Sequence, residues 1–360
     1  MRMRYLKASN ALAENIRRKL RRSGLIERQE TVEHSDSYVY FPLISISRAR
    51  VKKVIGSGTR FYIIEKATKN KERKPRNYRE ALKEILTEKE RDMVSGGYDI
   101  LGNIAILDIP KELGRKERAL ARAILDMHPS ISTVIAKDSA VKGRYRTRRF
   151  RHILGKKDYI AAYKENGCTF RFDVRKTFFS NRLSYERARL TSMAKDNETV
   201  VVMFAGIGPF GIEIAKAHPS SRVICVELNP YAAKAAIYNV AINKTDNVEV
   251  LEDDVRIAAG KLKGKANRII VPMPTSSLEF LDEISTVAGE GAVVHLYAFC
   301  SDTQGPEGAI SKISEHAAVN GYAIEVLSAR KARPYSSRES EMVIDYRISK
   351  KRKRKGTKTG

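Results

Sequence analysis

Apolar, β-branched runs recur seven times in the second half of the chain, and helix-like stretches lie between most of them. The runs predict strands near 200–203, 222–226, 248–251, 268–271, 291–298, 322–327 and 342–347. Regular alternation of strand and helix predicts an α/β fold with a doubly wound, Rossmann-like and mostly parallel sheet. The last two runs have no helix between them, so we expect them to form a terminal hairpin.

The first half of the chain mixes helical and strand patterns in two smaller α+β units. An amphipathic helix over 10–22 ends at Gly24. The stretch 70–76 is almost free of apolar residues and contains Pro75, which predicts a linker. The other elements expected are strands near 38–43, 60–64, 104–109, 133–136 and 163–171, and helices from Tyr78 and over 115–127. The domains expected are two small α+β domains at 1–70 and 77–160, the α/β domain at 161–349 and a basic tail at 350–360.

The net charge changes this picture most. Lys and Arg number 68 against 42 Asp and Glu, a formal net charge of +26 for 360 residues. A polyanionic partner explains such a charge, because cations that neutralise phosphates release condensed counterions. Part of the charge lies in the segment 142–152, KGRYRTRRFRH, where arginines alternate with Tyr145 and Phe150. This pattern favours single-stranded RNA, whose bases stack on rings, although a solvated basic hairpin is the alternative.

Other functional classes find little support. No apolar run reaches 18 residues and the first residues are not those of a signal peptide, so we expect a cytoplasmic protein without a membrane segment. Cys168, Cys225 and Cys300 are far apart, and we expect buried thiols. The six histidines have no ligand spacing, so we expect no metal.

A glycine motif follows the first strand of the α/β domain. Gly206, Gly208 and Gly211 fit G-x-G-x-x-G, in which missing side chains let the backbone turn tightly and approach a ligand. Glu227, about 20 residues further on, ends the next strand, where a carboxylate accepts hydrogen bonds from ribose hydroxyls. The motif predicts an adenosine cofactor, and by itself does not separate a dinucleotide from S-adenosylmethionine.

Two features favour S-adenosylmethionine. Asp253 and Asp254 end the third strand, where an acid can accept the adenine amine, and the terminal hairpin is typical of methyltransferase folds. Ligands of such sheets lie beyond the carboxyl ends of the strands. Gly206, Glu227, Asp254 and Pro272 all fall there, so we expect one pocket.

Almost the whole chain resembles the archaeal and eukaryotic type of tRNA (guanine37-N1)-methyltransferase, a family with a related branch that transfers an aminocarboxypropyl group in wybutosine synthesis. The resemblance rests on 178–189 FFSNRLSYERAR, 203–210 MFAGIGPF and 143–148 GRYRTR. It implies that a methyl group is transferred from S-adenosylmethionine to N1 of guanosine 37, beside the anticodon. It also implies that Glu186 is the general base and that Arg146 stabilises the charge on O6.

The chemistry agrees with these implied roles. Guanine N1 carries a proton, so its methylation needs a base within hydrogen-bond reach. An arginine at O6 is typically worth about 3 kcal/mol. By pattern alone, Glu186 is a helix-surface acid paired with Arg182 or Arg189, and Arg146 is a phosphate contact.

The motifs and the resemblance together give the remaining site residues. Those expected to hold the cofactor are Arg182, Phe204, Ala205, Gly206, Gly208, Glu227, Leu228, Asn229, Asp253, Asp254, Val255 and Pro272. Those expected to contact the tRNA are Arg144, Tyr145, Arg148, Arg149, Pro274, Thr275 and Ser276. We expect a monomer whose first domain and basic surfaces grip the tRNA body, while the target base enters between the second domain and the sheet.

The sequence departs from the family at two places. Val202 stands where the family usually has an acid, and Pro272-Met273-Pro274 stands where it has Asn-Leu-Pro or Asn-Pro-Pro. The asparagine that would hold the guanine edge is missing, and a backbone carbonyl or the hydroxyls of Thr275 and Ser276 are candidates to replace it. Aminocarboxypropyl transfer to, or methylation of, a modified guanosine 37 and a non-catalytic tRNA-binding protein are therefore alternatives. Arg182-Leu183 argues against the aminocarboxypropyl branch.

Overall fold

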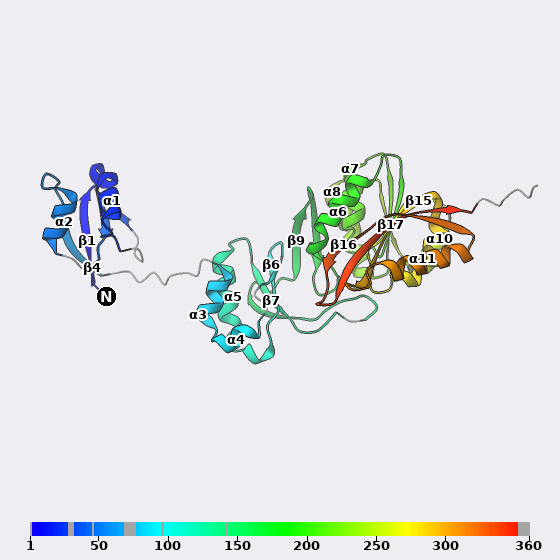
Figure 1. Cartoon of the computed structure of the whole chain (residues 1–360), viewed down its shortest axis with the longest axis horizontal. Coiled ribbons are helices and arrows are strands. Elements are labelled where there is room, and N and C mark those ends of the chain that lie inside the picture. Colours follow the sequence, from blue (N-terminus) through cyan, green and yellow to red (C-terminus); the bar gives the residue numbers. More distant parts are fainter. Residues whose placement is uncertain are drawn as a thin grey trace, which may run out of the picture. The chain divides into compact units, whose positions relative to one another are not determined.

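The computed structural model describes residues 2–27, 32–44, 47–67, 77–94, 97–141 and 143–351. The chain divides into two compact units, Met1–Lys74 and Pro75–Gly360 (Figure 1). The predicted linker at 70–76, and the basic tail except for Lys350 and Lys351, lie outside the described residues.

The smaller unit is a four-stranded sheet covered by two helices. In the order β2-β3-β1-β4, its strands are β1 (Arg2–Ser9), β2 (Glu33–His34), β3 (Tyr38–Pro42) and β4 (Tyr62–Ala67), and its helices are α1 (Ala13–Arg22) and α2 (Arg48–Ile55). Ile16 and Leu20 of α1 pack with Val51 and Ile55 of α2 in its core. The amphipathic helix is confirmed, whereas β1 and α2 were not predicted.

The larger unit begins with a second four-stranded sheet. In the order β5-β6-β7-β8, its strands are β5 (Asp99–Leu101), β6 (Ile104–Leu107), β7 (Thr133–Lys137) and β8 (Phe150–Gly155), with the helices α3 (Tyr78–Ile85), α4 (Glu88–Asp92) and α5 (Glu117–Met127). Leu120 and Ile124 of α5 pack against Val134 of β7 and Ile153 of β8. The helices and strands expected here are confirmed to within a few residues.

A two-stranded hairpin, β9 (Ile160–Glu165) and β10 (Cys168–Asp173), follows this sheet. The prediction of one strand over 163–171 is therefore wrong. Asn166 and Gly167 both take positive φ angles, 44° and 75°, which is the backbone conformation of a tight hairpin turn and which Asn-Gly favours.

The outer edge of β10 is bonded to asparagine side chains of α8 (Pro230–Asn243). The backbone N–H of Thr169 donates to Oδ1 of Asn243, and that of Arg171 donates to Oδ1 of Asn239, each at 2.8 Å. The Asn243 amide also donates to the carbonyl of Thr169 at 2.7 Å. The hairpin is thus attached to the α/β sheet through a helix that covers that sheet.

The seven predicted strands form one sheet in the order β13-β12-β11-β14-β15-β17-β16. They are β11 (Thr199–Met203), β12 (Arg222–Glu227), β13 (Val248–Glu252), β14 (Ala266–Val271), β15 (Ala288–Ser301), β16 (Tyr322–Pro334) and β17 (Glu339–Lys350). Strands β11 to β15 run parallel, and β17 pairs antiparallel with both β15 and β16. The doubly wound sheet and its terminal hairpin are confirmed.

Helices cover both faces of this sheet. The remaining ones are α6 (Ser184–Met193), α7 (Pro209–Ala217), α9 (Val255–Lys261), α10 (Leu281–Val287) and α11 (Glu307–Val319). Residues of α6 and α7 belong to one apolar core, and residues of α9, α10 and α11 belong to the other. Figure 1 shows α10 and α11 on the side of the sheet away from α6, α7 and α8. The sheet is therefore buried between two helical layers, as parallel strands require.

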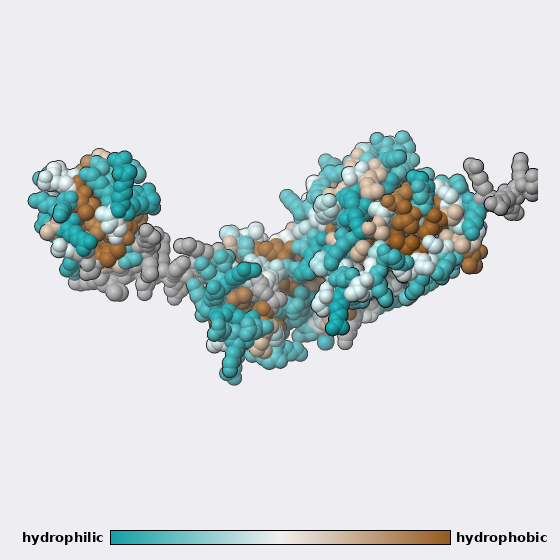
Figure 2. Space-filling view, viewed as in Figure 1, coloured by the Kyte–Doolittle hydropathy of each residue, from teal (hydrophilic) through white to brown (hydrophobic). Residues whose placement is uncertain are grey.

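The visible face of each unit is mostly hydrophilic, in line with the excess of charged residues (Figure 2). Among the described residues, no helix is both long and apolar enough to cross a membrane. The three cysteines are buried free thiols, as expected.

Candidate functional site: a pocket at the strand ends

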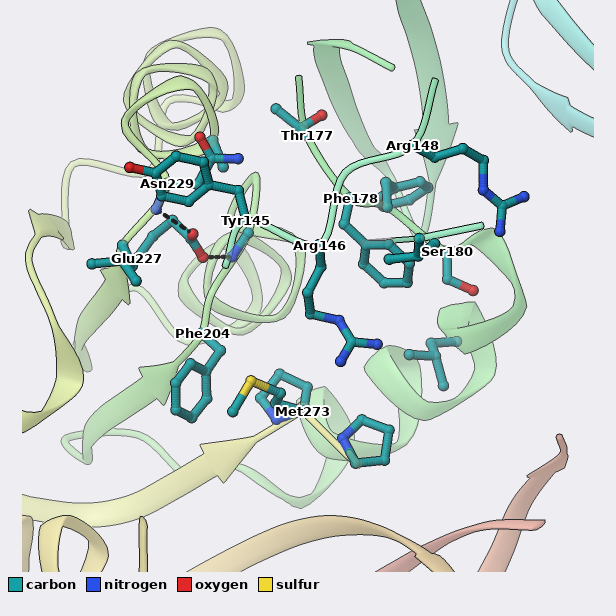
Figure 3. A pocket seen from close by; sticks show the side chains of 18 of the residues that line it. Tyr145, Arg146, Arg148, Thr177, Phe178, Ser180, Phe204, Glu227, Asn229 and Met273 are labelled. Atoms are coloured by element: carbon teal, nitrogen blue, oxygen red, sulfur yellow. Dashed lines mark hydrogen bonds between the residues drawn. The ribbon is translucent and has the colours of Figure 1, made fainter. Parts of the chain in front are cut away.

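A pocket of about 770 Å³ lies at the carboxyl ends of β11, β12 and β14. Its walls come from these strand ends, from the basic loop before β8, from the segment between β10 and α6, and from β16 and β17. In Figure 3 the guanidinium of Arg146 lies in the middle, with Glu227 and Phe204 to one side and Phe178 and Ser180 to the other. The pocket therefore joins the two segments in which the sequence placed its candidate residues.

The glycine turn and Glu227 form one hydrogen-bonded unit. Gly206 and Gly208 have φ angles of 59° and 86°, which side chains disfavour. The Glu227 carboxylate accepts the backbone N–H of Gly206 and that of Asn229, each at 2.7 Å (Figure 3). Burial raises the pKa of Glu227 above its ordinary value, although these N–H groups counteract the effect. A carboxylate held in this way retains lone pairs that can accept ribose hydroxyls.

Gly211 serves a different purpose from the other two glycines. It lies within α7, where an added Cβ would be 2.3 Å from Sγ of Cys225 on β12. Only a residue without a side chain lets α7 lie this close to the sheet. The helix N-terminus is thereby held at the pocket.

Asp254 connects the cofactor side of the pocket with the basic loop. One carboxylate oxygen accepts the backbone N–H of Arg256 at the start of α9, and the other accepts Arg144 at 3.0 Å. Nearby, the rings of Phe204 and Phe280 meet edge to face at 4.8 Å between centroids. The pocket thus combines an apolar wall with an acid, which suits an adenine.

Most residues expected to hold the cofactor line this pocket. They are Arg182, Phe204, Gly206, Glu227, Leu228, Asn229, Asp254, Val255 and Pro272. The lining does not include Ala205, Gly208 or Asp253. The Asp253 carboxylate pairs instead with Lys261 at 2.7 Å, and that hydrogen bond lowers the pKa of Asp253.

The residues expected to contact tRNA divide similarly. Arg144, Tyr145, Arg148, Pro274 and Ser276 line the pocket, whereas Arg149 and Thr275 do not. Arg146, the arginine expected at O6, also lines it. Arg146 has a positive φ of 51° and donates to the Thr275 hydroxyl, so the basic loop reaches the segment after β14. Burial lowers the pKa of Arg146, and its guanidinium lies 5.7 Å from the centre of the Phe178 ring.

Glu186 lies behind the pocket and is not part of its lining. Its side chain is 2% exposed. The carboxylate accepts the Tyr297 hydroxyl at 3.0 Å and the Nε of Arg189 at 3.2 Å, and it also pairs with Arg330. Of the two partners that the pattern suggested, Arg189 is present, while Arg182 pairs with Asp99 at 3.0 Å. A carboxylate with three donors is well positioned but has little room for a further one.

A buried polar chain continues from Arg189 through the sheet. Arg189 pairs with Asp345 at 2.7 Å, Asp345 with His295 at 2.6 Å, and His295 with Arg268 at 2.7 Å. Burial would raise the pKa of Asp345, but the hydrogen bonds from His295 and Arg189 hold it well below its ordinary range. His295 is fully buried in β15, between Asp345 and Arg268. Among the described residues, no group of three or more His, Cys, Asp or Glu could hold a metal ion.

The sequence patterns did not point to several residues of the pocket wall, among them a group of four on β15 to β17. The rings of Phe299 on β15 and Tyr335 after β16 stack at 3.9 Å between centroids with an interplanar angle of 29°. Arg333 on β16 pairs with Glu341 on β17, and all four residues line the pocket. No signal in the sequence pointed to these four residues, because β17 carries several charged positions besides Glu341.

Two family models match the larger unit. The TRM5/TYW2 methyltransferase domain matches residues 161–326, and the TYW2 N-terminal domain matches residues 78–158. The tRNA (guanine(37)-N(1))-methyltransferase Trm5b of Pyrococcus abyssi is 33% identical over 341 residues, which cover 93% of this chain and 96% of that protein. The chain belongs to the TRM5/TYW2 methyltransferase family.

Solved structures of the TRM5/TYW2 family share this fold. The complex of aTrm5 and tRNALeu has a TM-score of 0.79 and 27% identity, covering 96% of this chain and 99% of that one. TYW2 of Methanocaldococcus jannaschii, solved in complex with AdoMet, has a TM-score of 0.57 and 26% identity, covering 71% of this chain and 100% of that one. The family expected from the sequence motifs is thereby confirmed, and relatives from both of its branches resemble this chain.

Proposed function

We propose that this chain methylates N1 of guanosine 37 in tRNA, with S-adenosylmethionine as the methyl donor. The observation that carries the proposal is that Arg146, from the basic loop, and Glu227, from the strand ends, line one pocket. The relative of highest identity described above is named for this reaction, and structures of family members with tRNA and with AdoMet support both ligands.

The residues present fit such a donor. Glu227 keeps lone pairs for ribose hydroxyls, Asp254 offers a carboxylate in the same pocket that can accept an adenine amine, and Phe204 supplies an apolar surface. S-Adenosylmethionine supplies an electrophilic methyl group. Arg146 supplies positive charge for O6 of the guanine, where negative charge gathers when N1 loses its proton.

The resemblance assigns removal of this proton to Glu186. We retain that role as a prediction. In the structure, the Glu186 carboxylate lies outside the pocket lining and already accepts hydrogen bonds from three donors. A cytoplasmic location and a monomeric state without a metal belong to the same proposal.

The test is incubation of the purified protein with methyl-labelled S-adenosylmethionine and unmodified tRNA transcripts that carry G37 or A37. Digestion and mass analysis identify the labelled nucleoside. We expect 1-methylguanosine from the G37 transcript only. A product with an aminocarboxypropyl group, or no product despite binding of both ligands, contradicts the proposal.

A further inference from the structure

The stacked rings of Phe299 and Tyr335 lie on the side of the pocket away from the residues expected to hold the cofactor. Glu227 ends β12 and Asp254 follows β13, whereas Phe299 belongs to β15 and Tyr335 to the turn between β16 and β17. In the sheet, β14 lies between these two groups of strands. All four residues line the pocket, so the ring pair belongs to the half that is left for the second substrate.

The outer ring of this pair is open to a ligand. Tyr335 is 55% exposed, although Phe299 covers one face of its ring at 3.9 Å between centroids. Single exposed rings are ordinary on protein surfaces. Tyr335 differs from them because it is part of a pocket wall and is backed by a second ring. The two rings, which we call the aromatic platform, offer one flat face to a planar ligand.

Hydrogen bonds of the backbone fix the aromatic platform in place. The N–H of Asp302, directly after β15, donates to the carbonyl of Arg338 in the turn that carries Tyr335, at 2.9 Å. The N–H of Phe299 donates to the carbonyl of Pro274, after β14, at 3.2 Å. A surface that is already held in place loses little further freedom when a ligand stacks on it.

Positive charge surrounds the aromatic platform. Burial lowers the pKa of Arg146, while Tyr335 and Glu341 are near enough to oppose this shift. Arg333, two residues before Tyr335, lines the same pocket, and Arg338 is exposed on the turn. Rings among arginines are typical of surfaces that bind single-stranded RNA, because bases stack on the rings and guanidinium groups pair with phosphates. The ligand that fits is therefore an unpaired base of the tRNA.

The target guanine itself belongs at another position. Its N1 has to reach the methyl group of the donor, which we place at Glu227 and Phe204, while its O6 lies at Arg146. The ring of Phe178, centred 5.7 Å from the Arg146 guanidinium, is 43% exposed and offers this guanine a surface of its own. The aromatic platform is then left for a base next to the target. Extruding a base costs the stacking with its neighbours, and a ring that replaces this stacking lowers the cost.

We propose that the aromatic platform stacks on the base next to the target, at position 36 or 38, while guanosine 37 occupies the pocket. Tyr335 replaces the stacking partner that this base loses when guanosine 37 leaves the loop. The aromatic platform thus contributes to tRNA affinity and not to cofactor affinity. The inference rests on the proposed function.

Equilibrium binding of G37 tRNA tests the inference, with S-adenosylhomocysteine present so that no methyl group is transferred. Tyr335→Ala should weaken binding on the order of tenfold, the usual effect of removing a ring from a stacked base. Tyr335→Phe keeps the ring and should bind like the wild type. Tyr238→Ala is the matched control, because Tyr238 on α8 is 47% exposed and lies outside the pocket lining. It should also bind like the wild type.

Transcripts with an abasic nucleotide at position 36 or at position 38 identify the base. The wild type should bind one of them about tenfold more weakly than the intact transcript. Tyr335→Ala should lose nothing further on that transcript, because a broken contact cannot be lost twice. Losses that simply add on both transcripts overturn the inference.

Calorimetry with S-adenosylmethionine shows whether each variant is folded, and its affinity should be unchanged. If Tyr335→Ala does not bind the cofactor, Tyr335→Leu replaces it, since leucine keeps apolar bulk without a flat ring; the same loss of tRNA affinity is expected. Wild-type tRNA affinity in the variant tested, or an equal loss in Tyr335→Phe, overturns the inference. A wild-type protein that binds tRNA but forms no 1-methylguanosine overturns the proposed function instead.

Discussion

Replacing Gly211 by alanine measures how closely α7 packs against β12. The added Cβ would lie 2.3 Å from Sγ of Cys225 and 3.2 Å from Cγ1 of Val223. Carbon contacts are normally about 3.5–4.0 Å, so α7 has to move away by roughly an ångström. Both neighbours are fully buried in the middle of β12 and have little room to turn aside.

The expected loss of stability follows from two opposing effects. Alanine favours the helix over glycine by about 1 kcal/mol, and overpacking of this severity costs about 3 kcal/mol. Gly211→Ala should therefore lower the free energy of unfolding by about 2 kcal/mol. Affinity for S-adenosylmethionine should fall as well, because α7 begins directly after the turn that contains Gly206 and Gly208.

Cys225→Ala supplies the matched variant, since it removes the atom of closest approach. By itself it should cost about 1 kcal/mol through the lost burial of the thiol. In the double variant the added methyl group occupies the space that Sγ leaves, so the two losses should not add, and the coupling should be about 1–2 kcal/mol. Urea denaturation followed by circular dichroism measures the stability. A wild-type stability for Gly211→Ala, or strictly additive losses, would refute the close-packing argument.

Three further outcomes are expected. Glu227→Ala should weaken S-adenosylmethionine binding about 10- to 100-fold in calorimetry, because two backbone donors lose a charged acceptor. Arg146→Lys should lower the single-turnover rate on the order of 100-fold at unchanged cofactor affinity, because a planar guanidinium is lost at O6. Asp345→Asn should cost about 3 kcal/mol at pH 7. Since the pKa of Asp345 is depressed in the folded state, its contribution is present above about pH 4 and lost below it, so in acid denaturation the difference from the wild type should narrow as the pH falls.

The sheet was predictable because its parallel strands contain β-branched runs that alternate with helical patterns. Buried parallel strands such as β11 and β14 read as continuous apolar runs, with no competing pattern. The hairpin β9–β10 was read as one strand because the alternation of Tyr163 to Arg171 passes through its two-residue turn. The strand β1 was not predicted, because Arg2, Arg4 and Lys7 interrupt the alternation of its apolar positions.

The cofactor side of the pocket was predictable for a related reason. Gly206, Glu227 and Asp254 follow directly after strands, so their meeting at one edge follows from the sheet order. Glu341 lies within β17, and its place at the pocket depends on which strands flank β17. The pairing of β17 with β15, which α11 and β16 separate in the chain, leaves no local pattern, so this carboxylate became visible only in the structure.

The hydrogen bonds between α8 and β10 protect an edge strand from other chains. Residues four apart on a helix rise about 6 Å, and residues two apart on a strand rise about 7 Å, so Asn239 and Asn243 match Arg171 and Thr169 in spacing. A strand edge whose N–H and C=O groups are already bonded offers no template for strand addition. The two asparagines therefore work against edge-to-edge aggregation of a short hairpin, and they also fix its register, because a one-residue slip would turn the bonded N–H groups away.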